Sequence, residues 1–149
     1  MTISIRTAMA GERAELEELQ RRASLANERD RPHLLAHPDV IHLQLSQVLE
    51  KRVRVAEVAG RIVGFSAIIP KSPHVFDLDG LFVEPETWRH GIGRALVADA
   101  FESAKAQGGT SLEVVANLAA ETFYEKMGFE GLSLVETLFG PARLMRRNL

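Results

Sequence analysis

The sequence predicts a mixed α/β fold, in which helices cover a layer of strands. Segments that alternate like strands and segments with apolar residues at helical spacing follow one another in a single order: a strand, two helices, three strands, a helix, a strand, a helix and two strands. The chain has 149 residues, enough for one domain with one core, and no repeat, linker or low-complexity tract divides it. We therefore expect residues 1–149 to form a single domain.

The first elements are a strand and two helices. Residues 2–6 alternate between apolar and polar side chains and predict a short strand. In residues 10–26 the apolar side chains recur at helical spacing, with charged side chains on the opposite side, which predicts an amphipathic helix. Residues 27–38 are polar and contain two prolines, so we expect a loop there and a second helix near residues 39–49.

Three strands come next. Residues 53–58 and 62–69 are rich in strand-forming side chains and flank a turn at residues 59–61, a pattern typical of an antiparallel hairpin. Pro70 ends the second of these strands. Residues 75–83 alternate again and predict a third strand, which runs into a turn that contains glycines.

The remaining elements follow that turn. A helix begins near Gly91, carries an apolar stripe and stops at Gly108. After it come a strand, a helix and two strands, at residues 111–116, 117–127, 129–135 and 138–145. Because proline has no backbone N–H to donate, we expect Gly140 and Pro141 to interrupt the last strand.

The composition narrows the class of function. Charged residues make up 26% of the chain and hydrophobic residues 46%, a balance typical of globular proteins. The formal net charge of −2 argues against general nucleic-acid binding. The chain has no cysteine, which excludes disulfides, thiolate metal sites and a cysteine nucleophile, so an acyl group cannot pass through an acyl-cysteine intermediate.

The amino-terminal segment indicates the cellular compartment in which we expect the protein. Arg6, Glu12 and Arg13 fall where a signal peptide would need an unbroken apolar run. No later segment approaches the length of a membrane span. We expect a cytoplasmic protein whose partners include neither a membrane nor a nucleic acid.

The most informative pattern is the basic turn through Gly91 and Gly93, which joins an apolar strand to a helix. Glycine lets the backbone approach an anion closely, and the unpaired N–H groups at the start of the helix point toward it. Arg89, His90 and Arg94 add side-chain donors. The pattern predicts a phosphate-binding turn, although glycines between a strand and a helix often serve only to turn the chain.

A second pattern begins at Asn117, which is a natural N-cap for the helix that follows it. Tyr124, next to Phe123, lies two turns further along that helix. Taken singly, these residues have an ordinary structural explanation, because capping and aromatic packing account for them.

Together, the two patterns resemble the signatures of the GNAT superfamily of acyl-CoA-dependent N-acyltransferases. The order of elements extends this resemblance over nearly the whole chain. The family pattern Gln/Arg-x-x-Gly-x-Gly/Ala falls on residues 88–93, with Trp88 where Gln or Arg is usual. The second family pattern, Asn-x-x-Ala-x-x-Phe-Tyr-x-x-x-Gly-Phe, is matched at Asn117, Ala120, Phe123, Tyr124, Gly128 and Phe129.

The resemblance implies a fold and a cofactor. The fold would be a single domain with a mostly antiparallel, twisted sheet of about seven strands, a splayed parallel pair and about four flanking helices. Acetyl-CoA would be the acyl donor, a primary amine the acceptor, and no metal would take part. A homodimer is a common arrangement among similar proteins.

The resemblance also implies roles for individual residues. Those implied to contact the donor are Leu81, Phe82, Val83, Arg89, His90, Gly91, Ile92, Gly93, Arg94, Asn117, Phe123 and Tyr124. Backbone groups of residues 81–83 would bind the pantetheine arm, and residues 90–94 would hold the pyrophosphate. Arg89 would make part of the contact that Trp88 cannot. Tyr124 would be the general acid for the departing thiolate.

The acceptor amine must lose a proton, so a carboxylate, or a water chain that leads to one, is expected at the site. Asp77 and Asp79, on the strand before the basic turn, and Glu113, on the next strand, are the candidates for the general base. Each of them could also be a solvated charge at a sheet edge.

Other functions fit the sequence less well. A zinc site would have to use His33, His37, Asp39 and His42, which do not form a convincing ligand set without cysteine. A nucleoside triphosphate site is excluded because no Gly-Lys-Ser/Thr follows the glycines. We expect acetyl transfer to a small amine such as an amino acid, polyamine or aminoglycoside, because the chain is short. A protein amino terminus as acceptor and a non-catalytic acyl-CoA sensor stay open as alternatives.

Overall fold

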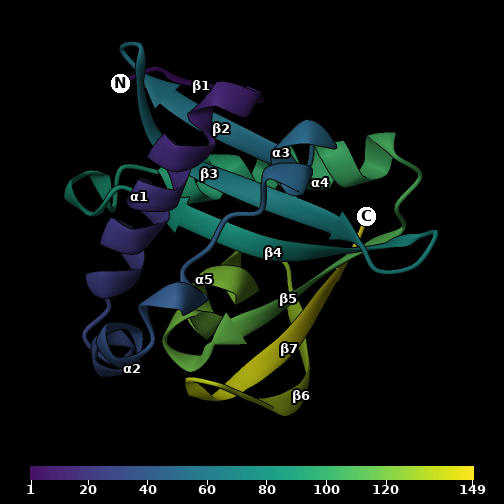
Figure 1. Cartoon of the computed structure of the whole chain (residues 1–149). Coiled ribbons are helices and arrows are strands. Elements are labelled where there is room, and N and C mark those ends of the chain that lie inside the picture. Colours follow the sequence, from purple (N-terminus) through teal and green to yellow (C-terminus); the bar gives the residue numbers. More distant parts are fainter. The chain divides into compact units, whose positions relative to one another are not determined.

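The computed structural model describes residues 1–149 and contains seven strands in one sheet, in the order β1-β2-β3-β4-β5-β7-β6 (Figure 1). The strands are β1 (Ile3–Thr7), β2 (Val53–Val58), β3 (Arg61–Pro70), β4 (Val75–Val83), β5 (Ser111–Asn117), β6 (Glu130–Thr137) and β7 (Gly140–Asn148). The α-helices are α1 (Arg13–Leu25), α2 (Arg31–Ala36), α3 (Leu45–Leu49), α4 (Ile92–Ala106) and α5 (Glu121–Lys126). The predicted mixed α/β fold is confirmed, with five helices instead of four.

The chain divides into two compact units. The first unit is Met1–Ala67 with Gly80–Leu96, and the second unit is Ile68–Asp79 with Val97–Leu149. Within the first unit, β1 pairs antiparallel with β2, and β2 with β3. Within the second unit, β7 pairs antiparallel with both β5 and β6, and β5 pairs parallel with the start of β4.

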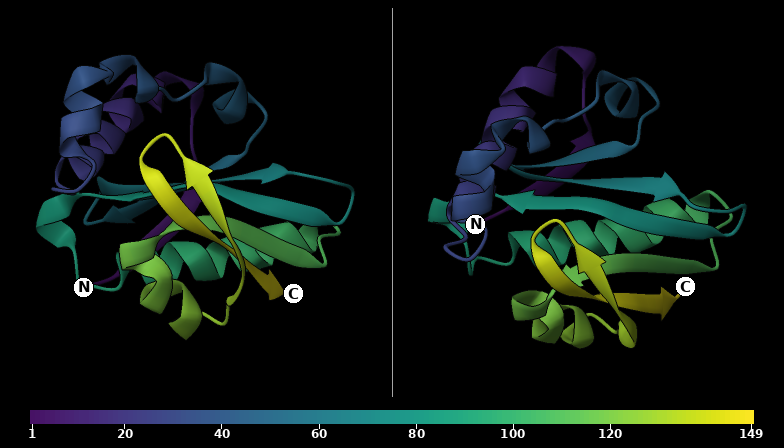
Figure 2. Two further views of the ribbon diagram at one scale, coloured as in Figure 1. Left: turned by 90° about the horizontal axis from the view of Figure 1, so that it is seen from below. Right: turned by 60° about the horizontal axis from the view of Figure 1, so that its bottom comes forward.

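The core of the first unit lies on both faces of the β2–β3 hairpin. On one face, Leu16 and Leu19 of α1 belong to a buried cluster with Val53, Val55 and Phe65. On the other face, a second buried cluster joins the hairpin to the start of α4, so helices cover both sides of these strands (Figure 2). The members of this second cluster are Ala56, Val63, Ile92 and Leu96. The start of α4 is thereby fixed to the sheet by apolar packing.

Gly64 of β3 allows this close approach. A Cβ atom there would lie 3.0 Å from the Phe82 carbonyl oxygen and 3.2 Å from side-chain atoms of both Ile92 and Leu96. These distances are shorter than ordinary van der Waals contact between carbon atoms. A residue with a Cβ at this position would require the Phe82 carbonyl and the Ile92 and Leu96 side chains to shift by a few tenths of an ångström.

In the second unit, the parallel pair of β4 and β5 is short. Val75–Asp77 of β4 pair with Ser111–Glu113 of β5, although the strands continue to Val83 and Asn117. The predicted parallel pair is therefore present, and its register covers only the first part of each strand. On the helical face of this unit, Phe101 of α4 packs against Phe129, with ring centroids 5.7 Å apart.

Two predicted elements near residue 40 are wrong. The loop predicted at residues 27–38 contains α2, because Pro32 lies in the first turn of a helix, where its missing N–H costs nothing. The helix predicted at residues 39–49 is reduced to α3. Ile41 and Leu43 are buried while their neighbours are exposed, so this stretch follows the alternation of extended chain.

The prediction for the last strand is also wrong in one respect. Pro141 does not interrupt β7, which begins at Gly140. Pro141 is paired with Glu136 of β6, whereas the register between β7 and β5 starts one residue later, at Ala142. The proline therefore lies beyond the end of β5, so its missing N–H removes no hydrogen bond to that strand.

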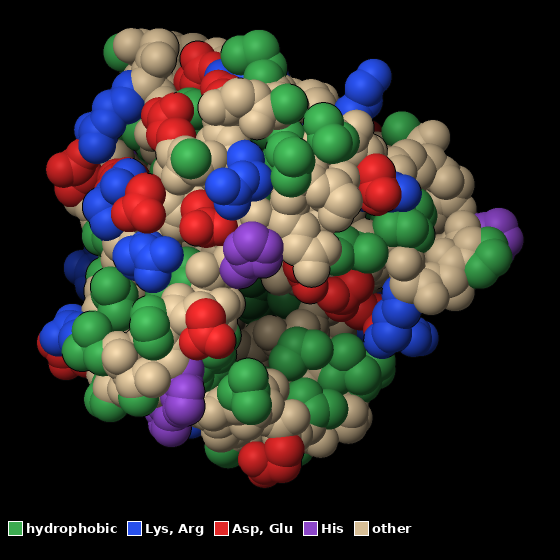
Figure 3. All heavy atoms as spheres, in the orientation of Figure 1, with side chains coloured by type: hydrophobic (Ala, Val, Ile, Leu, Met, Phe, Trp, Pro, Cys, Tyr) green, Lys and Arg blue, Asp and Glu red, His purple; other side chains and the backbone are tan.

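The surface is mixed in charge. Acidic and basic side chains are interspersed on the face seen in Figure 3, and many form ion pairs, such as Arg6 with Glu12 at 2.7 Å and Arg13 with Glu17 at 3.1 Å. None of the helices combines the length and the apolar composition that crossing a bilayer requires.

Candidate functional site

The predicted phosphate-binding turn is a loop with two left-handed residues. From here on, "the phosphate loop" means residues 84–94, which lead from the end of β4 into α4. Arg89 has φ of +70° and Gly91 has φ of +82°. Such conformations turn successive backbone N–H groups toward one point and make an anion-binding concavity. Glycine adopts them freely, whereas Arg89 is held in a conformation that L residues avoid.

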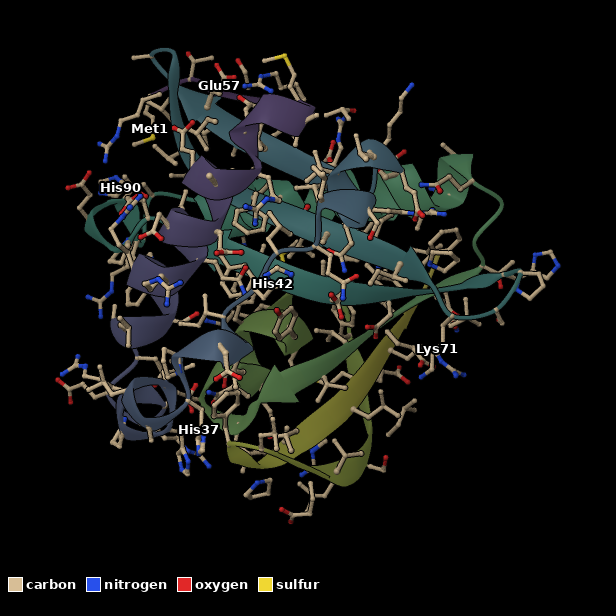
Figure 4. The ribbon with its side chains drawn as sticks, viewed as in Figure 1. Met1, His37, His42, Glu57, Lys71 and His90 are labelled. Carbon is tan, nitrogen blue, oxygen red and sulfur yellow. The ribbon has the colours of Figure 1, made fainter.

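The start of α4 adds further donors to this loop. The first hydrogen bond of the helix runs from Ala95 N to Gly91 O, at 3.0 Å. The N–H groups of the preceding turn therefore lie outside the helical ladder and carry the positive end of the helix dipole. Arg89, His90 and Arg94 are exposed around it, and His90 lies at the outer edge of the loop (Figure 4). The structure brings these predicted donors together on one loop.

Trp88 is fixed to the end of β4. Its indole Nε1 donates a hydrogen bond of 2.8 Å to the Val83 carbonyl oxygen, and 44% of the side chain is exposed. The Val83 carbonyl, in the segment predicted to bind pantetheine, therefore already accepts one hydrogen bond. Leu81 and Phe82, from the same segment, are half-buried, and the Phe82 ring lies 5.3 Å from that of Phe65.

Glu84, which the sequence analysis missed, fixes the first residue of the loop. Its side chain is only 7% exposed, and both of its oxygens accept hydrogen bonds of 2.8 Å from the guanidinium of Arg22 on α1. The hydrogen bond from Arg22 lowers the pKa of Glu84, against the effect of burial. No local pattern could have revealed this pair, because the two residues are 62 positions apart in the chain.

The three candidate bases differ in their surroundings. Asp77 and Glu113 are register partners in the parallel pair of β4 and β5, and Asp79 follows Asp77 on the same face of β4. Asp77 is half-buried, and Asp79 is exposed. Burial raises the pKa of Asp77, and the negative charges of Asp79 and Glu113 raise it further, while Lys71 acts in the opposite direction. We call Asp77, Asp79 and Glu113 the acidic group.

Glu113 is the buried and paired member of the acidic group. It is 2% exposed and accepts hydrogen bonds from Lys71 Nζ at 2.6 Å and from Arg146 Nε at 2.8 Å. Burial acts to raise the pKa of Glu113, but these two cations outweigh it and lower the pKa. Lys71 reaches this site from the turn between β3 and β4 (Figure 4). A carboxylate held in this way stays ionised, and its low affinity for a proton makes it a weak base.

Asn117 and Tyr124 lie at the two ends of the second pattern. Asn117 ends β5, and its Oδ1 accepts a hydrogen bond of 2.8 Å from Ala119 N, so it caps the short turn that leads into α5. Tyr124 is 7% exposed and lies edge-on to Phe123 and Phe129, with ring centroids 5.1 and 5.4 Å away. Burial raises the pKa of Tyr124, so the phenol keeps its proton at neutral pH.

The histidine-rich segment does not form the alternative zinc site. No group of three or more histidine, aspartate or glutamate side chains in the structure is placed to hold a metal ion. His42 is instead paired with Glu17 of α1, with 3.2 Å between Nδ1 and Oε2. The same carboxylate accepts a hydrogen bond from Leu43 N and anchors the extended segment before α3.

A comparison with protein families gives one match that covers more than half of the chain. The family model described as the acetyltransferase (GNAT) domain matches residues 50–131. This stretch includes the phosphate loop, the acidic group and Tyr124.

One relative is similar to part of the chain. An N-acetyltransferase of Methanocaldococcus jannaschii, described as uncharacterized, is 36% identical over 103 residues, which are 62% of this chain and 44% of the relative. The matched stretch is thus less than half of that relative's length.

The PaiA N-acetyltransferase of Thermoplasma acidophilum, solved in complex with coenzyme A, has a TM-score of 0.82 at 18% identity, with both chains fully covered. The ribosomal-protein-S18-alanine N-acetyltransferase of Escherichia coli has a TM-score of 0.73 at 18% identity, covering 99% of this chain and 94% of that one. At these identities the two structures show a shared fold.

Proposed function

The chain belongs to the GNAT family of acyl-CoA-dependent N-acetyltransferases, and on this basis we propose that it transfers the acetyl group of acetyl-CoA to a primary amine of a small molecule. Two observations support the proposal: the phosphate loop offers backbone donors, and the acidic group contains a carboxylate whose pKa is raised by burial. The first suits a nucleotide-type donor, and the second suits an amine.

The donor would bind through the phosphate loop. We assign the pyrophosphate to the backbone N–H groups of residues 90–94, because the two left-handed residues and the free end of α4 supply several donors there. Arg89 would add a charged donor beside them. Backbone groups of residues 81–83 would bind the pantetheine arm, and Asn117 and Phe123 would contact it further along.

The acceptor would be deprotonated by Asp77. A general base works best when its pKa lies near the working pH, and burial raises the pKa of Asp77. Glu113 is engaged with two cations, and Asp79 is exposed and contributes negative charge. An amine arrives as an ammonium ion, which the clustered carboxylates attract.

The reaction would then proceed by direct attack in a ternary complex. Asp77, directly or through a water, first takes one proton from the ammonium ion, and the neutral amine nitrogen then bonds to the thioester carbon. A backbone N–H stabilises the resulting oxyanion. As the carbon–sulfur bond breaks, the Tyr124 hydroxyl donates its proton to the departing sulfur, and the second proton lost by the nitrogen returns to the Tyr124 oxygen, directly or through water. The products are the N-acetylated amine and coenzyme A.

Several finer features of this proposal go beyond family membership. We propose that residues 1–149 act as one catalytic domain and that the enzyme works in the cytoplasm. We favour a small-molecule acceptor over a peptide amino terminus, which carries the same ammonium group and is the competing acceptor.

The test is a panel of acceptors with release of free thiol as the signal. Acetyl-CoA and longer acyl-CoA donors are each incubated with amino acids, polyamines, aminoglycosides and short peptides with free amino termini. We expect thiol release that depends on one class of small amine and is fastest with the acetyl donor. Turnover with peptides alone would reassign the acceptor. Binding of acetyl-CoA without turnover on any amine would instead support a sensor.

A further inference from the structure

Glu84 occupies the point where the phosphate loop leaves the sheet. Its backbone N donates a hydrogen bond of 2.7 Å to Val63 O on β3, and its carbonyl oxygen accepts hydrogen bonds from Thr87 N at 2.9 Å and Thr87 Oγ1 at 2.8 Å. Its buried carboxylate reaches the other way, to the guanidinium of Arg22. Glu84 therefore connects β3, the loop and α1.

We propose that Arg22 and Glu84 are a positioning pair for donor binding, which holds the phosphate loop in its anion-binding conformation. The proposal rests on the proposed function, since it concerns how the loop binds the diphosphate of acetyl-CoA. Neither residue needs to touch the donor, because the pair acts on the backbone that does.

The loop needs such support because its conformation is costly. Arg89 has φ of +70°, a left-handed conformation that is unfavourable for an L residue because its Cβ comes too close to the backbone. A site made of backbone N–H groups gives high affinity only when these groups are aimed before the ligand arrives, since ordering the loop on binding would reduce the affinity. The two-pronged Arg22–Glu84 contact fixes both the position and the orientation of the first loop residue.

A second ion pair on the same loop provides a matched control. Glu86 pairs with Arg61, but these side chains are 60% and 59% exposed, compared with 7% for Glu84. An exposed pair of this kind contributes little, because water competes for both charges. The two glutamates are two positions apart in the chain, so substitution of either removes one negative charge from the same short segment.

The experiment compares Glu84→Gln with Glu86→Gln by calorimetry, using coenzyme A and acetyl-pantetheine, which lacks the diphosphate. We expect Glu84→Gln to weaken coenzyme A binding about tenfold, equivalent to about 1.4 kcal/mol, and Glu86→Gln to weaken it less than about twofold. Binding of acetyl-pantetheine should change less than about twofold in both variants. Trp88 is the one tryptophan of the chain, so its fluorescence emission reports the conformation of the loop in each variant.

A conservative variant guards against a folding defect. Arg22→Lys keeps the positive charge but cannot form the two-pronged contact, and half of the Arg22 side chain is exposed, so this variant should fold. It should shift coenzyme A affinity in the same direction as Glu84→Gln, by a smaller factor, and leave acetyl-pantetheine affinity unchanged.

Each outcome separates this inference from the proposed function. If the wild-type chain binds coenzyme A and Glu84→Gln binds it equally well, the pair is only structural and the inference is overturned alone. Equal loss of coenzyme A and acetyl-pantetheine affinity would also overturn it, because the effect would not lie in the diphosphate site. If the wild-type chain does not bind coenzyme A, the proposed function and the inference are both wrong.

Discussion

The phosphate loop and the acidic group, which we propose bind the two substrates, are built in different ways. The loop offers backbone N–H groups, whose positions depend on conformation and hardly on side-chain identity. The acidic group depends on the side chains themselves, and the proton affinity of each carboxylate is set by its neighbours. If the loop binds the donor through its backbone, Trp88 can stand where the family pattern has Gln or Arg. The roles that we propose for Asp77 and Glu113 depend instead on the side chains around each carboxylate.

The comparison is sharpest within the acidic group. Asp77 and Glu113 are register partners, yet two cations satisfy Glu113, and burial beside negative charge leaves Asp77 with a raised pKa. Glu113 therefore stabilises the fold in its ionised form. Asp77 costs the fold stability when it is ionised, a burden typical of functional residues.

The largest expected effect is that of Asp77→Asn. Loss of the general base should lower kcat by about 10²- to 10⁴-fold. A raised native pKa means that the ionised form is disfavoured by folding, so stability falls as pH rises through that pKa, and Asn should leave thermal stability at neutral pH equal or higher. Steady-state kinetics and thermal unfolding test both parts. In the wild type, kcat/KM should fall as pH drops through the raised pKa.

Glu113→Gln is the matched control for that variant. It removes the partner of Lys71 and Arg146 and should lower the free energy of unfolding by about 1–3 kcal/mol. Because the pKa of Glu113 is lowered in the fold, its contribution is present above the ordinary glutamate pKa and is lost as pH falls through the native pKa. If Glu113→Gln lowers kcat more than Asp77→Asn does, the base has been assigned to the wrong carboxylate.

Tyr124→Phe should lower kcat by about 10²-fold and leave acetyl-CoA affinity nearly unchanged. The phenol matters when negative charge builds on sulfur, which happens only in the reaction. A tyrosine that serves packing alone would give wild-type turnover, since phenylalanine keeps the edge-on contacts with Phe123 and Phe129. Kinetics and calorimetry on the folded variant decide between the two roles.

Gly91→Val tests whether the loop acts through its conformation. At φ of +82° a β-branched residue costs about 1–2 kcal/mol, so coenzyme A affinity should fall roughly tenfold. A Cβ at Gly91 would meet no atom within 4 Å, so the fold itself should persist. Unchanged affinity by calorimetry would contradict the assignment of the diphosphate to this loop, and Gly93→Val provides a second test of it.

The smallest expected effect is that of Arg89→Ala, since one exposed side chain adds to several backbone donors. We expect coenzyme A affinity to fall about threefold to tenfold and pantetheine affinity to stay the same. An equal loss of affinity for coenzyme A and pantetheine would mean that Arg89 acts on the conformation of the loop. The comparison would then need revision, because a side chain would control the backbone site.

The sequence predicted what depends on local pattern. The strand, the turn through Gly91 and the following helix were found because glycine and helical periodicity are local signals, and the family resemblance gave the positions of Asn117 and Tyr124. Contacts between distant parts of the chain carry no such signal, so the Arg22–Glu84 pair and the cations on Glu113 were missed. Pro32 was interpreted as a loop residue, whereas it lies in the first turn of α2.

Gly64 has a consequence for how sequence variants of this protein should be judged. It lies inside the first unit, and its missing Cβ sets the spacing between β3, Phe82 and the start of α4. An alanine there would require the Phe82 carbonyl and the Ile92 and Leu96 side chains to move by a few tenths of an ångström, beside the first turn of α4. A mutational scan should therefore record loss of donor binding at a residue that no ligand touches, and a conservative Gly64→Ala change should rank among the damaging ones.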